Sequence, residues 1–366
     1  LIDFGWRAVR EMTLTAKAIV DAYYTPALTK SYWQGCSSGG KQGLKEAQKF
    51  PEDYDGIIAG APAIPWTRLS AASLAVGRAT LPVDSPRYLS REKLKVLNES
   101  MIRACDKLDR VEDGLLEDPR ACTFEAKALE CSGEANANCL TTAQVESAHK
   151  IYSPLRNPRT YEYLFAGFAK GSELGWSLIA GGPKPLSISN DHYRFVVFEN
   201  PDWDFQTLDF DKDVARADEI DAKGAQLNAA DPNLDAFRKR GGKLLMYHGW
   251  ADGLIPAQNS IDYFESVLTR DDESRSSAAL ARLQQDVRLF MVPGMGHCGG
   301  GTGPDKFDAL TALEQWVEAG KPPSQLVAEV QVNAGANRTR PLCVYPKVAS
   351  YIGRGDPNEA SSFECK

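Results

Sequence analysis

Residues 30–49 carry the pattern on which the fold prediction depends, KSYWQGCSSGGKQGLKEAQK. A short β-rich run at 30–35 leads into Gly35-Cys36-Ser37-Ser38-Gly39, and a helical pattern follows at 41–49. A G-x-S-x-G turn between a strand and a helix holds its serine in a strained backbone conformation that projects the hydroxyl. The glycines are required because side chains two residues either side of the serine would collide. The pattern predicts Ser37 as a nucleophile, although a glycine-rich turn with a solvated serine also fits.

Three further apolar runs predict buried strands, at 54–61 (YDGIIAGA), 243–248 (KLLMYH) and 287–292 (VRLFMV). Together with 30–35 they are short and spaced for helical crossovers, which predicts an α/β fold with a parallel sheet. About 180 residues separate the second run from the third. A structureless loop of that length is improbable in a compact fold, so we predict an inserted lid domain at 63–235 between core segments 1–62 and 236–366.

The last two strands are each followed by a candidate catalytic residue. KLLMYHG leads into Trp250-Ala251-Asp252, and VRLFMVPG leads into Met295-Gly296-His297. The order serine, aspartate, histidine is that of an α/β-hydrolase, so we predict Ser37, Asp252 and His297 as a triad. The Ser38 N–H, at the start of the following helix, is the predicted oxyanion donor.

Other histidines and carboxylates provide alternatives to this triad. His248 falls within a predicted strand and is expected to be a core histidine, whereas His149 and His192 belong to the lid. Asp262 and Asp286 are alternatives to Asp252, but both fall at predicted helix or strand-edge positions.

The region before the predicted strand that leads into Ser37 differs from that of a complete α/β-hydrolase. One helical pattern, at 6–23, stands where such a core has several strands and where the loop after the third strand supplies a second oxyanion donor. We therefore expect N-terminal strands to be missing from this chain. Loss of one oxyanion donor lowers the rate by roughly 10²–10³-fold.

Composition excludes two classes of partner. The net charge of −7 disfavours nucleic acid, because binding to phosphates depends on Lys and Arg. We also expect no membrane span, because no apolar run approaches ~18 residues.

Eight cysteines predict a disulfide framework. Three local couples stand out, Cys105 with Cys122, Cys131 with Cys139, and Cys343 with Cys365. Cys36 directly precedes the candidate nucleophile and Cys298 directly follows the candidate base, so a bond between them would restrain the triad. Disulfides predict a secreted or periplasmic protein, whereas eight free buried thiols would indicate the cytosol.

These motifs resemble the tannase and feruloyl esterase family, which also contains mono-hydroxyethyl terephthalate hydrolases. The resemblance rests on Cys36-Ser37, Asp252 and His297-Cys298, with Asp3-Phe4-Gly5 and Arg7-Ala8-Val9 near the start. It implies an α/β-hydrolase core with a lid inserted before the strand that leads into the catalytic aspartate. It also implies a secreted serine hydrolase that cleaves esters of aromatic acids through an acyl-enzyme on Ser37, and sugar- or polysaccharide-linked esters are among the expected substrates.

The same resemblance implies residues that contact the substrate. Leu254 and Ile255, just after Asp252, are expected to line the acyl pocket. The lid aromatics Trp176 and Phe195 are further candidates, although aromatic side chains more often pack in cores.

The resemblance implies a structural calcium ion in the lid, within Cys105–Pro119 (CDKLDRVEDGLLEDP). Its ligands would be the carboxylates of Asp106, Asp109 and Asp113 with the carbonyls of Val111 and Leu115. Six acids between 106 and 118 repel one another, and a hard cation relieves that repulsion. A solvated acidic loop is the alternative.

Two rival functions accompany the feruloyl-esterase or tannase interpretation. One is hydrolysis of a terephthalate half-ester by an enzyme of the same family. The other is a catalytically impaired, calcium-stabilised module that binds aromatic glycosides. Ester hydrolysis abolished by Ser37→Ala would distinguish the enzymes from the module.

Overall fold

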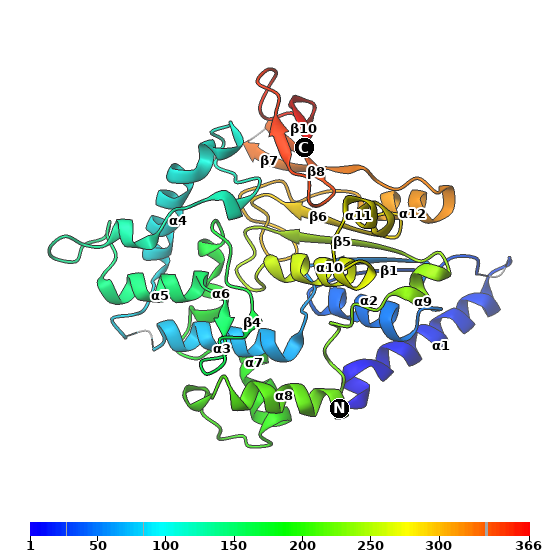
Figure 1. Cartoon of the computed structure of the whole chain (residues 1–366), viewed down its shortest axis with the longest axis horizontal. Helices are drawn as coiled ribbons and strands as arrows, with labels where there is room; N and C mark the ends of the chain where they lie inside the picture. The colour runs from blue at the N-terminus through cyan, green and yellow to red at the C-terminus, as the bar shows by residue number, and fades with distance from the viewer. Residues whose placement is uncertain (27, 83, 334–335) are drawn as a thin grey trace.

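A computed structural model describes the chain from residue 1 to 366 apart from residues 27, 83, 334 and 335 (Figure 1). Its centre is a parallel sheet in the order β1-β2-β5-β6. The strands are β1 (Tyr32–Cys36), β2 (Gly56–Gly60), β5 (Lys243–Gly249) and β6 (Val287–Val292). These are the four runs from which the sequence predicted a parallel sheet, and the α/β prediction is confirmed. Among the described residues, β1 has a strand partner on one side only.

Both faces of this sheet are covered at β2, β5 and β6, which explains why these strands are apolar without alternation. Ile57, Leu244 and Met246 point to one face and pack against α2 (Ser38–Lys49), α10 (Gln258–Asp271) and α11 (Ser277–Leu283). Ile58 and Leu245 alternate to the other face and pack against α12 (Ala309–Ala319) and the hairpin of β7 (Gln325–Asn333) and β8 (Ala336–Cys343).

The chain between β2 and β5 forms helices with apolar clusters of their own. Its main elements are α3 (Trp66–Thr80), α4 (Arg91–Cys105), α5 (Thr142–Tyr152), β3 (Leu155–Arg156), β4 (Tyr163–Phe165), α6 (Ser177–Ala180), α7 (Ser187–Asp191) and α8 (Lys212–Lys223). Figure 1 shows most of these helices gathered beside the sheet. The division of the chain at residues 63 and 235 remains a prediction.

Shorter elements complete the fold. The first helix begins as a π-helical turn, Asp3–Arg7, and continues as α1 (Ala8–Tyr23). The remaining elements are α9 (Asp235–Lys239), β9 (Ala349–Tyr351) and β10 (Phe363–Cys365). Within the described part of the chain, no helix has both the length and the apolar character needed to cross a bilayer.

The eight cysteines form four disulfides. Three are the local couples, Cys105–Cys122, Cys131–Cys139 and Cys343–Cys365. The fourth joins Cys36 to Cys298 across 262 positions of sequence. The expected disulfide framework is therefore present.

Candidate active site

Ser37 occupies the sharp turn between β1 and α2. Its backbone has φ 62° and ψ −119°, a conformation that L-residues rarely adopt. The turn is held by Ser37 N–H donating to the Gly60 carbonyl at 2.9 Å and by Ser37 O accepting from Lys41 N–H at 3.0 Å. A Cβ on Gly35 would lie 2.6 Å from the Gly39 backbone, which explains the spacing of the two glycines. The half-buried serine is thus fixed at the N-terminus of α2.

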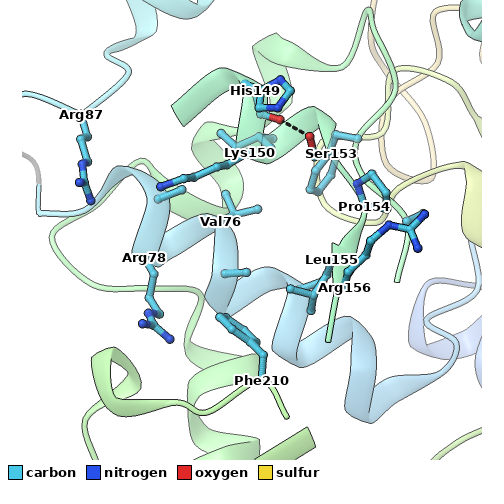
Figure 2. A pocket seen from close by; sticks show the side chains of 16 residues that line it. Val76, Arg78, Arg87, His149, Lys150, Ser153, Pro154, Leu155, Arg156 and Phe210 are labelled. Carbon is cyan, nitrogen blue, oxygen red and sulfur yellow. Dashed lines mark hydrogen bonds between the residues drawn. The ribbon is translucent and has the colours of Figure 1, made fainter. Parts of the chain in front are cut away.

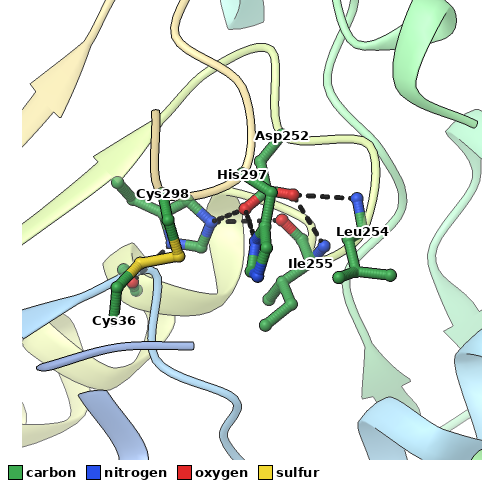
Figure 3. The surroundings of a disulfide bond; sticks show 8 residues. Cys36, Asp252, Leu254, Ile255, His297 and Cys298 are labelled. Atoms are coloured by element: carbon green, nitrogen blue, oxygen red, sulfur yellow. Dashed lines mark hydrogen bonds and ion pairs between the residues drawn. A yellow bond between two sulfur atoms is a disulfide. The ribbon is translucent and has the colours of Figure 1, made fainter. Parts of the chain in front are cut away.

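Asp252 follows β5 and is buried with both carboxylate oxygens hydrogen-bonded (Figure 3). Oδ1 accepts from the N–H groups of Leu254 at 2.8 Å and Ile255 at 2.9 Å. Oδ2 accepts from His297 Nδ1 at 2.8 Å and His248 Nε2 at 3.1 Å. Burial acts to raise the pKa of Asp252, but the two histidine hydrogen bonds outweigh it and hold that pKa well below its usual range. The carboxylate therefore remains charged.

His297 has the orientation that a general base requires. Because the Asp252 oxygen can only accept, Nδ1 of His297 donates in this bond, which leaves Nε2 as the nitrogen for proton transfer. The side chain is 16% exposed. Within the described residues, Ser37 Oγ makes no direct hydrogen bond to His297, a separation common in substrate-free sites.

The disulfide between Cys36 and Cys298 links the nucleophile turn to the base loop (Figure 3). Its two Cα atoms are 5.9 Å apart, and each cysteine is the chain neighbour of a candidate catalytic residue. Cys298 has φ 64°, so the loop turns sharply directly after His297. The bond thereby holds Ser37 and His297 on adjacent loops.

His248 extends the network around Asp252. It is fully buried, as a core histidine should be, but the sequence did not indicate that it contacts the candidate acid. Nε2 lies 3.1 Å from both Asp252 Oδ2 and the Ile255 carbonyl, so it must donate to these acceptors. Nδ1 lies 2.7 Å from the buried hydroxyl of Ser260. His248 therefore joins both ends of the loop 252–255.

The alternative carboxylates are engaged elsewhere. Asp262 accepts from Tyr163 and Gln258, and Asp286 pairs with Lys243 and Arg238. Among the described contacts, neither reaches His297.

The four expected substrate contacts lie in different surroundings. Ile255 is 3% exposed and Leu254 is partly buried. Both belong to the loop after β5 that carries Asp252, and both pack against side chains of α3. Trp176 is buried among side chains of the segment between β2 and β5 and donates from Nε1 to Ser172 Oγ at 2.9 Å, whereas Phe195 is 52% exposed. A Cβ on Gly175, the residue before Trp176, would lie 2.9 Å from Gly253. The backbone at Gly175 therefore packs against the loop 252–255. Substrate contact by these four residues remains a prediction.

The acidic segment after α4 folds as a closed loop bounded by the Cys105–Cys122 disulfide. Asp106 accepts from Gly114 N–H at 2.9 Å, and Asp109 accepts from Val111 N–H at 3.1 Å. Burial raises the pKa of Asp109 to about 6. Asp113 accepts from its neighbour Leu115 N–H and forms an ion pair with Arg340.

This loop has some features of a cation site. In the described structure Asp106 and Asp109 form no salt bridge, so their oxygens face only backbone donors. No three His, Cys, Asp or Glu side chains of the described residues converge as a metal-binding group. The calcium prediction therefore rests on carbonyl ligands as well as carboxylates.

Comparisons with known proteins agree with this geometry. Residues 1–366 match the family described as tannase and feruloyl esterase. An uncharacterized esterase of Xanthomonas campestris is 36% identical, and probable feruloyl esterase B-1 of Aspergillus flavus is 34% identical; the alignments cover 100% of this chain and 70% and 71% of those proteins. The crystal structure of feruloyl esterase B from Aspergillus oryzae has a TM-score of 0.90 at 31% identity, covering 100% of this chain and 75% of that one. This chain therefore belongs to the tannase and feruloyl esterase family and is a carboxylic ester hydrolase of the α/β-hydrolase fold.

Proposed function

We propose that the protein hydrolyses esters of aromatic acids, as a feruloyl esterase or tannase does, through an acyl-enzyme on Ser37. The observation that carries the proposal is the linkage of a strained serine turn to the His297–Asp252 pair, 2.8 Å apart, through one disulfide. The named relatives supply the class of acyl group. A sugar or polysaccharide on the alcohol side belongs to the same proposal.

The residues act in a fixed order in this proposal. Nε2 of His297 takes the Ser37 proton while Oγ attacks the ester carbonyl, and Asp252 stabilises the imidazolium that forms. The Ser38 N–H, at the N-terminus of α2, donates to the developing oxyanion. His297 then protonates the departing alcohol. Water attacks the acyl-enzyme by the same route in reverse, releases the aromatic acid and restores the Ser37 hydroxyl.

We further propose that the protein works in an oxidising compartment, secreted or periplasmic. Four disulfides support this, because thiols are kept reduced in the cytosol.

A calcium ion on the acidic loop is also proposed. Asp106, Asp109 and Asp113 with the carbonyls of Val111 and Leu115 would hold it, since calcium prefers six to eight oxygen ligands. The ion would supply positive charge to Asp106 and Asp109, which form no salt bridge among the described residues. The other acids of the loop have cationic partners: Arg340 pairs with Asp113 and Glu117, Lys107 with Glu112, and Arg120 with Asp118. We expect EDTA to lower the melting temperature and added Ca²⁺ to restore it. An unchanged melting temperature in both conditions would reject the ion.

A panel of esters tests the enzymatic proposal. Methyl ferulate, methyl p-coumarate, methyl gallate and mono-(2-hydroxyethyl) terephthalate are compared by product release. We expect turnover of the hydroxycinnamate or gallate esters, and loss of it by at least ~10³-fold in Ser37→Ala, because the nucleophile is removed. If the terephthalate half-ester is hydrolysed faster than the other three esters, the result would instead favour a terephthalate half-ester hydrolase.

Ser38→Ala is the matched control, because the proposed donor is a backbone N–H that alanine retains. We expect its kcat/KM to stay close to that of the unsubstituted protein. Activity that survives Ser37→Ala would refute the acyl-enzyme at this position.

A further inference from the structure

The inserted region contains a cavity of about 490 Å³ between α3, α5 and the segment leading into β3 (Figure 2). Its lining does not include Ser37, Asp252 or His297, so it is distinct from the triad. Val76, Ala79, Ile151 and Phe168 form a buried apolar floor. A cavity of this size with an apolar floor is typical of small-molecule sites.

Four cations surround this floor, Arg78, Arg87, Lys150 and Arg156. Among the described residues, no aspartate or glutamate lines the cavity, although the chain has 49 acidic and 42 basic residues. None of the four cations forms an ion pair within the described part of the chain. Figure 2 shows Arg78, Arg87 and Lys150 along one side of the hollow. Positive charges gathered without a counter-charge favour an anionic ligand.

Two of the guanidinium groups are held in place by neutral partners. Arg78 donates from Nη1 to the Leu208 carbonyl at 2.6 Å and lies 5.1 Å from the centre of the Phe210 ring. Arg156 donates from Nη1 to the Tyr161 carbonyl at 3.1 Å. These contacts restrain both side chains, and each guanidinium keeps N–H donors that these bonds do not use.

We propose that this cavity binds an aromatic carboxylate, with the ring on the apolar floor and the carboxylate against the cations. A strongly hydrated anion would not use the floor, and a neutral sugar would leave the cations without a counter-charge. The identity of the ligand rests on the proposed function, because the acid released from the acyl-enzyme is an aromatic carboxylate. The cavity is then a second site for the product acid, away from Ser37.

Binding of ferulate to the Ser37→Ala protein tests the inference, measured by calorimetry at low salt. We expect ferulate to bind at this site. Methyl ferulate, which lacks the carboxylate charge, and glucuronate, which lacks the aromatic ring, should each bind at least tenfold more weakly. Arg87→Gln combined with Lys150→Gln is expected to weaken ferulate binding about tenfold. Both side chains are exposed, so the substitutions leave the apolar floor intact.

The matched control removes two exposed cations from α4, Lys95→Gln with Arg103→Gln, and should leave ferulate binding unchanged. Lys150→Glu, a single exposed change, should weaken binding at least as much as the double substitution. Ferulate affinity unaffected by the cavity variants would place the ligand at the triad and overturn the inference, as would equal affinity for glucuronate.

Failure of this inference is separable from failure of the proposed function. Ester turnover by the unsubstituted protein without cavity-dependent ferulate binding would leave the function standing and remove the second site. Cavity-dependent binding of ferulate by a protein that hydrolyses none of the esters would keep the binding site and reject the proposed esterase function.

Discussion

At the scale of single residues, the four hydrogen bonds on Asp252 define how firmly the acid is held. His248 contributes one of them and also binds the Ile255 carbonyl, so it positions Asp252 without reaching the substrate. Replacement by a residue without a donor leaves the carboxylate oxygen with one partner and frees the loop. His248 is therefore a positioning residue for the proposed reaction.

We predict that His248→Leu lowers kcat by about 10–100-fold, the cost usual for removing a supporting hydrogen bond from a site. His248→Gln should recover much of the loss, because its amide N–H reaches toward the same oxygen. Steady-state kinetics checks this, with melting temperatures measured alongside. Equal activity of the two variants would mean that the donor is unimportant.

The effects of His248 and Asp252 should not be additive. In an Asp252→Ala background, His248→Leu is expected to cause little further loss of kcat, because its partner is already gone. A full additional loss would indicate that His248 acts through packing alone.

Another residue-scale prediction concerns the buried His192, whose two ring nitrogens have no hydrogen-bond partner among the described residues. Burial, aided by the charge of Lys41, lowers its pKa from 6.5 to about 4. The unfolded chain therefore binds a proton between pH 6.5 and 4 that the folded protein does not. The stability contributed by neutral His192 is present above pH 6.5 and is lost as the pH falls to about 4.

We expect His192→Phe to reduce this acid sensitivity. Denaturant unfolding at pH 7 and pH 4.5 gives the difference in the free energy of unfolding for each protein, which should be smaller in the variant by about 1–3 kcal/mol. Comparison with the variant removes contributions from other titrating groups. The same pH dependence in both proteins would contradict the prediction.

At the scale of elements, the disulfide between Cys36 and Cys298 ties the turn after β1 to the loop after β6. We predict that replacing both cysteines with alanine lowers kcat by about 100-fold, because a displacement of ~1 Å between reacting groups has such an effect. KM should change less. The matched control replaces Cys131 and Cys139, which close a span of 8 positions within the insertion. Similar losses of kcat in both variants would argue against a specific role for the first bond.

Elements also show what the sequence could and could not predict. The turn at Ser37 was predictable because the constraint is local: Gly35 and Gly39 are four residues apart and their backbones touch. The pairing of Asp252 with His297 was predictable because both residues follow apolar strands in the expected order. The contact between His248 and Asp252 was not predictable, since it exists only when the loop 252–255 folds back on β5. The burial of Trp176 likewise depends on packing within the segment between β2 and β5, which no local pattern encodes.

At the scale of the whole molecule, the large insertion leaves the sheet from β2 and returns to it at β5, and these two strands are direct neighbours. The two ends of this long insertion therefore lie side by side in the sheet. The entropy of closing such a loop grows only with the logarithm of its length. A chain of this fold can therefore have a longer, shorter or rebuilt segment between β2 and β5 while the strands that lead to Ser37, Asp252 and His297 keep their positions, so a change in that segment does not require a new core.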